Sequence, residues 1–294
     1  MAQIGFIGIG IMGKPMAGHL LAAGHTVNAY DRNVDALNEL ASKGAVVCHS
    51  SKEVAASSDV IIVMVPDTPD VEAVLFGPDG VADGIKKGSI VVDMSSISPI
   101  ATKEFAKKLM DMGVEMLDAP VSGGQVGAEK AILSIMVGGK AEVFEKIRPY
   151  FELMGKNIVH IGDNGAGQTC KVANQIAVAV TIAATAEALS FASKAGADPA
   201  KVREALMGGL AGSRIMELLG ERMVKRTFQP GFRIRLHQKD LNLALQSSRA
   251  LHMSIPSTAV AQEMFNSVAP RDGLDLDHSA MVLALEQLAN HPVA

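Results

Sequence analysis

The stretch that decides the fold is Ile4-Gly5-Phe6-Ile7-Gly8-Ile9-Gly10-Ile11-Met12-Gly13, near the start of the chain. Its first four residues are mostly apolar and predict a short buried strand, and three glycines then follow with the spacing G-x-G-x-x-G. A strand that runs into such a turn and opens a helix, here over residues 11–23, holds a pyrophosphate at the helix N-terminus. The alternative is a tight turn that binds nothing. We expect cofactor contacts from Gly8, Ile9, Gly10, Ile11, Met12 and Gly13.

An acidic residue follows the next strand-like run. Residues 26–30 are typical of a β-strand and end at Asp31, about 20 residues past the turn. A carboxylate at that point accepts hydrogen bonds from the adenosine ribose of NAD and repels the additional phosphate of NADP. Arg32 lies beside it and could accommodate that phosphate. The pattern therefore favours NAD as the cofactor and leaves NADP possible.

Length and composition bound the class of protein. The chain has 294 residues, a formal net charge of −4 and two cysteines. This length predicts about two domains, and the absence of a Lys/Arg cluster argues against nucleic-acid or membrane partners. Cys48 and Cys170 lie far apart, without a metal-ligand or redox spacing, which favours a reduced cytoplasmic compartment. No bound metal and no N-terminal targeting segment are expected.

The first half of the chain alternates strand-like and helix-like stretches. Two continuous apolar runs, residues 59–65 and 90–94, are typical of parallel strands buried on both faces. This rhythm predicts an α/β fold with a doubly wound Rossmann-type sheet over residues 1–163. The expected strands are residues 4–7, 26–30, 45–48, 59–65, 90–94, 115–118, 133–137 and 158–161, and the expected helices are 11–23, 34–42, 100–112 and 141–154.

Ligands of such sheets gather at the carboxyl ends of the strands. Besides the glycine turn, this rule selects three loops: Met64-Val65-Pro66, Ser95-Ser96 and Ser122-Gly123-Gly124. The last offers a hydroxyl and backbone N–H groups without side-chain bulk, which suits a substrate carboxylate. A plain glycine-rich turn is the alternative there.

Residues 164–294 contain no clear strand pattern and predict an all-α domain for substrate binding and oligomerisation. One long helix enters it and runs from Gln168 to residue 195 without a breaker. Its apolar part is interrupted by Asn174, Gln175 and Glu187, so a buried central helix is favoured over a membrane span. Further helices are expected over residues 199–207, 214–225, 239–251, 258–268 and 279–288.

The expected chemistry lies where the long helix begins. Lys171 and Asn174 are three residues apart and share a helical face. A lysine whose pKa is lowered by burial can act as a general acid, and the amide could hold the substrate or the lysine in position. An ordinary surface lysine is the alternative. His237 is a rival proton donor, for which a structural part is favoured, and Cys170 is interpreted as a buried small residue rather than a nucleophile.

A cluster near the C-terminus could suggest a metal site. Asp275, Asp277 and His278 lie close in sequence, but Asp277 directly precedes a helical run. A helix N-cap is the simpler interpretation of Asp277.

Four segments resemble the β-hydroxyacid dehydrogenases, in the family's order along the chain: residues 5–13, Asp118-Ala119-Pro120-Val121-Ser122-Gly123-Gly124, residues 165–174 and His237-Gln238-Lys239-Asp240-Leu241. The resemblance implies that Lys171 is the catalytic acid/base and that Asn174 and the Ser122 segment contact substrate. It also implies that Ser96 and Lys239 reach the nicotinamide side of the cofactor.

The expected activity follows from this resemblance. The chain should be an NAD(P)-dependent oxidoreductase that acts on a small β-hydroxyacid with a carboxylate. Independently of the resemblance, the high apolar content of the helical second domain predicts a homodimer or homotetramer. Residues 208–213 and 230–232 resemble the members that reduce short hydroxylated semialdehydes rather than the 3-hydroxyisobutyrate enzyme. That enzyme, or a related glyoxylate reductase, is the alternative. A dinucleotide-binding scaffold without turnover is a more distant one.

Overall fold

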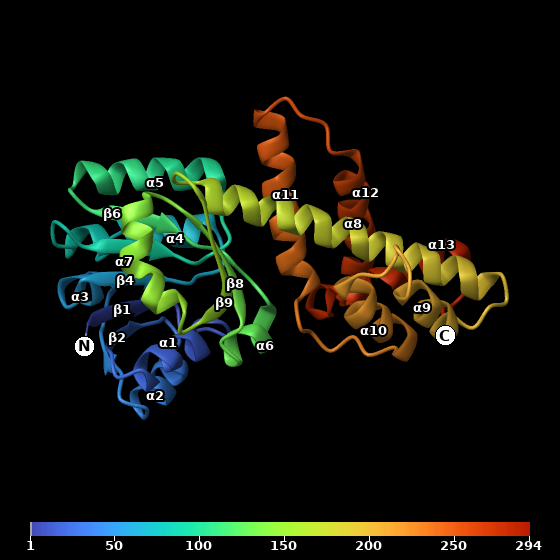
Figure 1. The fold of residues 1–294 in the computed structure, drawn as a ribbon, viewed down its shortest axis with the longest axis horizontal. Coiled ribbons are helices and arrows are strands. Elements are labelled where there is room, and N and C mark those ends of the chain that lie inside the picture. Colours follow the sequence, from blue (N-terminus) through green and yellow to red (C-terminus); the bar gives the residue numbers. More distant parts are fainter. Residues whose placement is uncertain (1) are drawn as a thin grey trace. The chain divides into compact units, whose positions relative to one another are not determined.

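The computed structural model describes residues 2–294 and consists of two compact units (Figure 1). The first comprises Met1–Lys171 and the second Val172–Ala294, so the dividing point lies within helix α8 (Ala166–Lys194). The predicted domain boundary, between residues 163 and 164, lies in the turn that precedes this helix. Where an independently folding domain would begin stays a prediction.

The first unit is built on a sheet that has nine strands in the described part of the chain. The first six are all parallel, in the order β3-β2-β1-β4-β5-β6, and β8 then pairs antiparallel with β6 and β7 and parallel with β9. The strands are β1 (Gln3–Ile7), β2 (Thr26–Tyr30), β3 (Val46–Val47), β4 (Val60–Val63), β5 (Ile90–Asp93), β6 (Glu115–Asp118), β7 (Val121–Ser122), β8 (Leu133–Gly138) and β9 (Gly155–Gly162).

Helices cover both faces of this sheet, and each face has its own apolar core. One core contains Met16, Leu40 and Phe151, from α1 (Gly13–Ala22), α2 (Val34–Ala41) and α7 (Ala141–Phe151), and α6 (Gly124–Glu129) adds Ala128. The other contains side chains of α3 (Ser51–Ala56), α4 (Thr68–Phe76), the short helix η1 (Val81–Asp83) and α5 (Pro99–Asp111). The central strands are buried on both faces, which explains their continuous apolar runs. The predicted doubly wound sheet is confirmed.

The second unit is helical, as predicted. One face of α8 contributes Ala179, Ile182, Ala186 and Leu189 to a core, at the spacing of successive helical turns. The other helices are α9 (Pro199–Met207), a π-helical turn η2 (Met216–Gly220), α10 (Glu221–Lys225), α11 (Ile234–Ala250), α12 (Pro256–Val268), the short turns η3 (Ala269–Arg271), η4 (Gly273–Asp275) and η5 (His278–Met281), and α13 (Val282–Ala289).

Helix α8 has the length and apolar composition that a membrane span also has. Within the described residues it is the one helix that meets this test, and 33% of its most apolar window is buried in the structure. Its buried face packs into the core of the second unit, as the sequence interpretation expected.

Several short elements were not predicted. Helices α3 and α4 were not recognised, and the Ser122 segment, interpreted as a loop, is a two-residue strand followed by the first turn of α6. The two-residue strand and the six-residue helices contain too few turns to establish a hydrophobic period, and α4, although it has nine residues, is only weakly amphipathic. The predicted helix over residues 214–225 is correct in place but begins as a π-helical turn.

Candidate active site

The predicted ligand loops of the first unit leave the sheet along one edge. The last paired residues of five neighbouring strands form a single row: Tyr30 pairs with Ile7, Ile7 with Val63, Val63 with Asp93 and Asp93 with Asp118. The loops that follow these residues therefore begin side by side. Because β1 pairs with β2 on one side and β4 on the other, the strand order reverses at the glycine turn. That position is where sheets of this class bind their ligands.

Each glycine of the turn has its own role. A Cβ on Gly8, whose φ is +97°, would lie 2.1 Å from the Met64 carbonyl oxygen, and a Cβ on Gly13 would lie 1.9 Å from that of Gly8. Gly8 is thus required for the turn and Gly13 for the close contact between helix and strand. A Cβ on Gly10 would meet nothing within 4 Å, and Gly10 is exposed. No described side chain caps the start of α1. This turn has the open backbone face that a pyrophosphate needs.

Asp31 closes the glycine turn from the end of β2. Its carboxylate accepts hydrogen bonds from the backbone N–H groups of Ile9 and Asn33, which holds it beside the turn. Arg32 lies next to it, with a side chain that is 81% exposed and 3.1 Å from Asp70 Oδ1. The side chain predicted to favour NAD is therefore tied to the glycine turn, while its basic neighbour extends into solvent.

The loops after β4 and β5 are joined by one buried hydroxyl. Ser95 Oγ accepts a hydrogen bond from Val65 N at 3.0 Å, and Ser95 N donates to Asp93 Oδ1 at 3.0 Å. Ser95 is fully buried, whereas Ser96 is only partly buried. Of the two predicted serines, Ser95 therefore holds the Met64-Val65-Pro66 loop in place. Ser96 remains the one that a bound molecule can reach.

The Ser122 segment combines a strand end with a helix start. Ser122 pairs with Ser134 at the end of β7, and Gly123 and Gly124 have φ values of 136° and 61° at the start of α6. These positive φ values favour glycine. Ser122 and Gly124 are partly buried and Gly123 is exposed. The part of this segment in holding a carboxylate stays a prediction.

A buried carboxylate anchors the start of α8. Asp118 Oδ1 accepts from Gly165 N at 2.8 Å and Oδ2 from Gln168 N at 2.9 Å, so the end of β6 caps a helix nearly 50 residues later. Burial raises the pKa of Asp118, although these N–H bonds lower it in part. Gly167 permits the approach, because a Cβ there would lie 2.5 Å from the Asp118 carbonyl oxygen.

Gln168 connects the same helix start to the serine loop. Its side chain is fully buried, donates from Nε2 to the Ser95 carbonyl oxygen at 2.7 Å and accepts from Ile97 N at 3.1 Å. Lys171 follows three residues later and is only 7% exposed. The predicted lysine is therefore on a helix turn that two side-chain contacts attach to the carboxyl edge of the sheet. Sequence reasoning missed both Asp118 and Gln168 as parts of this arrangement.

In the second unit, the predicted Asn174 and Lys239 belong to one polar chain. Asn174 Nδ2 donates to Gln175 Oε1 at 2.7 Å, and Gln175 Nε2 donates to Asp240 Oδ2 at 2.6 Å. Lys239 Nζ lies 3.0 Å from the other oxygen of Asp240. Gln175 was interpreted only as an interruption of an apolar run. It is in fact buried one helical turn beyond Lys171, on the same face of α8.

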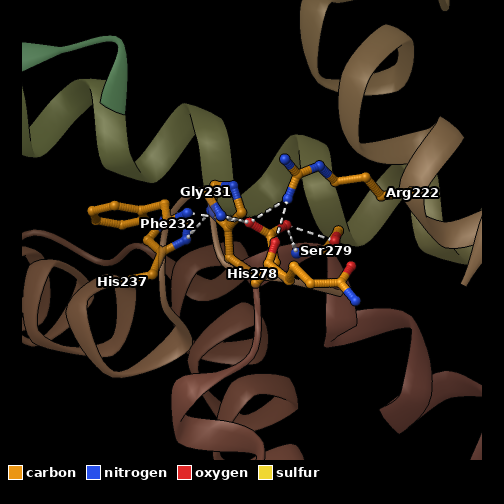
Figure 2. Close-up of polar contacts among 8 residues, drawn as sticks. Arg222, Gly231, Phe232, His237, His278 and Ser279 are labelled. Atoms are coloured by element: carbon orange, nitrogen blue, oxygen red, sulfur yellow. Dashed lines mark hydrogen bonds and ion pairs between the residues drawn. The ribbon is translucent and has the colours of Figure 1, made fainter. Parts of the chain in front are cut away.

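His237 is a buried residue of the second unit and belongs to the polar network drawn in Figure 2. Its ring is fully buried, between Phe265 and Phe232, and its Nδ1 lies 3.1 Å from Nδ1 of His278. Its Nε2 lies 3.5 Å from the Gln175 carbonyl oxygen. Since that oxygen only accepts, a neutral His237 carries its proton on Nε2 and accepts from His278. The part of His237 in proton transfer stays a prediction.

Asp277 organises the other end of this network. It accepts from the backbone N–H groups of Gly231 and Phe232, from the hydroxyl and N–H of Ser279, and lies 2.9 Å from Arg222 Nη1 (Figure 2). Burial alone would raise the pKa of Asp277, but His278 and these hydrogen bonds lower it overall. The predicted N-cap is confirmed, because Asp277 caps the η5 turn.

Two protein-family models match the chain. Residues 3–162 match the NAD binding domain of 6-phosphogluconate dehydrogenase, and residues 165–285 match the NAD-binding domain of NADP-dependent 3-hydroxyisobutyrate dehydrogenase. The two matches correspond to the sheet-based segment and to the helical segment that begins at α8.

Individual relatives cover almost the whole chain. The 2-hydroxy-3-oxopropionate reductase of Escherichia coli (strain K12) is 59% identical over 292 residues, which are 99% of this chain and 100% of the relative. The solved structure of Mycobacterium tuberculosis 3-hydroxyisobutyrate dehydrogenase with L-serine has a TM-score of 0.89 at 33% identity and covers 97% of this chain and 99% of that one. Psf3 in complex with NADP+ and 2-OPP has a TM-score of 0.86 at 26% identity, over 96% and 99%.

Proposed function

The chain belongs to the 3-hydroxyisobutyrate dehydrogenase-like family of NAD(P)-dependent oxidoreductases, and from this premise we propose that it is a 2-hydroxy-3-oxopropionate reductase. It would reduce the aldehyde of tartronate semialdehyde (2-hydroxy-3-oxopropanoate) and form glycerate. The observation that carries the proposal is the 59% identity to a reductase of that name over the full length of both chains. The intact glycine turn, Lys171 and Ser122 segment support it.

The residues of the glycine turn fit a dinucleotide. Gly10 leaves space for a pyrophosphate, the start of α1 offers N–H groups that no described side chain caps, and Asp31 is held where the ribose should lie. The Met64-Val65-Pro66 loop and Ser96 would line the nicotinamide end, and Lys239 is assigned to it by the family resemblance. When bound, the nicotinamide supplies the hydride.

Lys171 is the proposed proton donor. As the aldehyde carbon is reduced, its oxygen gains negative charge, and the Lys171 ammonium protonates it; in the reverse direction the neutral amine removes that proton. The low exposure of Lys171 supports this role, because burial of an ammonium favours its neutral form. Asp118 and Gln168 would keep the lysine in place through the first turn of α8.

The Ser122 segment is the proposed carboxylate site. Its hydroxyl and the N–H groups of Gly123 and Gly124 provide donors for the substrate's charged end, which would orient the aldehyde. Asn174 is the proposed contact for another polar group of the substrate. A substrate held at its carboxylate need not be recognised through a large apolar side group, which suits a three-carbon acid.

We propose NADH as the preferred reductant, because Asp31 lies beside the turn that would receive the pyrophosphate. The exposed Arg32 supports some use of NADPH, as does the similarity to a structure that contains NADP+. The second candidate function is 3-hydroxyisobutyrate dehydrogenase, which the solved structure at 33% identity supports less strongly.

A substrate panel tests these proposals. Purified protein is assayed with tartronate semialdehyde, glyoxylate and methylmalonate semialdehyde, each with NADH and with NADPH. Fastest turnover of tartronate semialdehyde with NADH is expected. Preference for methylmalonate semialdehyde would favour the second candidate, and cofactor binding without any turnover would favour a dinucleotide-binding scaffold.

We propose a homodimer or homotetramer in the cytoplasm. Large apolar side chains of the second unit are exposed in the single chain, including Phe191 (77% exposed) on α8 and Leu288 (81%) on α13. Burying such side chains between subunits is favourable. A monomer at micromolar concentration in light scattering would contradict this.

The cysteines agree with the proposed cytoplasmic location. Both cysteines are free, and burial raises the pKa of Cys48 to about 11, which agrees with a reducing compartment.

A further inference from the structure

Three side chains of the second unit form a directed line of hydrogen bonds. It begins at Asp240 on α11, passes through the side-chain amide of Gln175 on α8 and ends at the amide of Asn174. Asp240 and Gln175 are each 4% exposed. Since water has little access to these two groups, their orientations depend on the protein groups around them.

The direction of this line follows from the chemistry of its members. An ionised carboxylate has only acceptors, so Gln175 must present its NH2 group to Asp240 Oδ2. The carbonyl end of Gln175 is then the atom that meets Asn174, which must in turn present its own NH2 group. The Oδ1 end of Asn174, an acceptor, is consequently the end that points away from Gln175.

We propose that Asp240 is a positioning residue that determines, through Gln175, which end of the Asn174 amide is offered to the substrate. The inference rests on the proposed function, since Asn174 is assigned to the substrate there. An acceptor at this position recognises a donor, and tartronate semialdehyde and glycerate both carry a hydroxyl at C2. The opposite orientation would offer an NH2 group, which suits a carbonyl or carboxylate oxygen instead.

The other oxygen of Asp240 does not alter the orientation of the Gln175 amide. Lys239 Nζ lies 3.0 Å from Oδ1 and is a donor under all conditions in which it is charged. Oδ2 of Asp240 therefore accepts the hydrogen bond from Gln175, while Oδ1 forms an ion pair with Lys239. A neutral amide in its place would keep its oxygen toward Lys239 and turn its NH2 group toward Gln175, which would have to reverse its own amide to accept from it.

Exchanging the hydrogen-bond donor and acceptor between Gln175 and Asp240 tests the proposal. In Gln175→Glu two carboxyl groups face each other and must share a proton to keep the hydrogen bond. The variant should therefore show an added ionisation, with turnover lost as pH rises. In Asp240→Asn turnover should fall about tenfold without an added ionisation, because the NH2 group introduced at position 240 would reverse the Gln175 amide and, with it, the Asn174 amide.

The double variant Gln175→Glu/Asp240→Asn restores the original pattern. The asparagine introduced at position 240 would donate to the carboxylate introduced at position 175. The other oxygen of that carboxylate would accept from Asn174, as Gln175 does now. Turnover should return to within about threefold of native, without the added ionisation. A double variant no faster than the slower single variant, or a native pH profile in Gln175→Glu, would overturn the proposal.

The matched control is Gln125→Glu on α6. Gln125 also donates to a carboxylate, Glu129 Oε1 at 2.8 Å, but this pair is exposed. Solvent screens the repulsion there, so no added ionisation in the pH profile is expected.

Thermal unfolding across pH gives a readout that needs no substrate. Since the carboxyl group introduced by Gln175→Glu would have a raised pKa in the single variant, its stabilising contribution is present at low pH and lost as pH rises. The double variant should lack this dependence.

The native protein, the two single variants and the double variant are assayed with whichever substrate the native protein turns over. Failure to turn over tartronate semialdehyde alone would therefore reject the proposed function and leave the test of Asp240 intact.

Discussion

Helices α1 and α8 both begin at the carboxyl edge of the same sheet, but the N–H groups at their N-termini have different uses. At α1 no described side chain caps the helix, and the turn before it is made of glycines. At α8 the carboxylate of Asp118 accepts from the N–H groups of Gly165 and Gln168. A helix N-terminus attracts negative charge in either case.

We infer from this difference that the start of α1 serves to bind a ligand and the start of α8 serves to position Lys171. The start of α1 can receive the charge of a ligand, whereas the start of α8 has received the charge of the protein's own carboxylate. The latter arrangement fixes a helix turn that carries Lys171. We expect substitutions at the first helix to act on cofactor affinity, and substitutions at the second to act on turnover and stability.

The largest effect is expected from Lys171→Ala. Without its proton donor the enzyme should turn over about 10²–10⁴-fold more slowly, while NADH affinity should change little, since the glycine turn is untouched. Lys171→Arg should restore little activity, because a guanidinium does not release its proton near neutral pH. Steady-state kinetics and NADH titration of native and variant protein are compared.

Two results would contradict the assignment of Lys171. Near-native turnover of Lys171→Ala would transfer the acid role to another group, His237 first. A parallel loss of NADH binding would instead make Lys171 a cofactor contact, and the proposed separation of the two helix starts would fail.

The α1 region could be predicted from the sequence because its determinants are local. Strand β1, the three glycines and Asp31 lie within about 30 residues, and each has a known mechanical reason for its place. The alternation of apolar runs and amphipathic stretches likewise predicts the sheet and the helices of the second unit. Short elements such as α3 lack a detectable period and were missed.

The partners at α8 could not be predicted, because they are distant in sequence. Gln168 contacts Ser95 and Ile97 more than 70 residues earlier, and Gln175 contacts Asp240 65 residues later. A buried glutamine in an apolar helix gives no local signal of the carboxylate that will face it. Lys171 was found from its helix position and the family resemblance, whereas the side chains that hold its helix turn needed the structure.

The next largest effect concerns cofactor choice. Asp31→Ser removes a carboxylate that should accept from the ribose, and the preference for NADH over NADPH should fall by about 10–100-fold, the equivalent of a charged hydrogen bond. kcat/KM with each cofactor is measured. Arg32→Ala is the matched control and should instead reduce only the activity with NADPH. A native preference for NADPH would show that Arg32, not Asp31, sets the specificity.

A smaller effect is expected at the start of α8. Asp118→Asn should lower the free energy of unfolding by about 1–3 kcal/mol at neutral pH, because an NH2 group would face one of the two N–H donors. Urea unfolding of both proteins measures the difference. NADH affinity should be unchanged, which distinguishes this helix start from that of α1.

The pH dependence of that difference follows from the direction of the pKa shift. Burial raises the pKa of Asp118 from its ordinary value of 3.8, so the folded state binds this proton more tightly than the unfolded chain. The associated stability is fully present below about pH 4 and is lost as pH rises through the folded pKa. The advantage of native over Asp118→Asn should thus widen on acidification; a constant difference would mean that Asp118 titrates alike in both states.

The smallest effect is expected at Gly10, in the turn before α1. Gly10→Ala adds a methyl group that meets no protein atom within 4 Å, so the fold should be unaffected, yet the methyl would stand between the backbone and the pyrophosphate. NADH affinity should fall on the order of tenfold, about 1.4 kcal/mol. Gly18→Ala is the control: Gly18 lies within α1, the helix that follows this turn, and its added methyl would also meet open space, so it should stabilise the helix by about 0.5–1 kcal/mol without changing NADH binding. Equal NADH affinity in Gly10→Ala and native protein would mean that the phosphates do not approach the backbone at this glycine. The proposal that the start of α1 binds the cofactor, while the start of α8 positions Lys171, would then be wrong for α1.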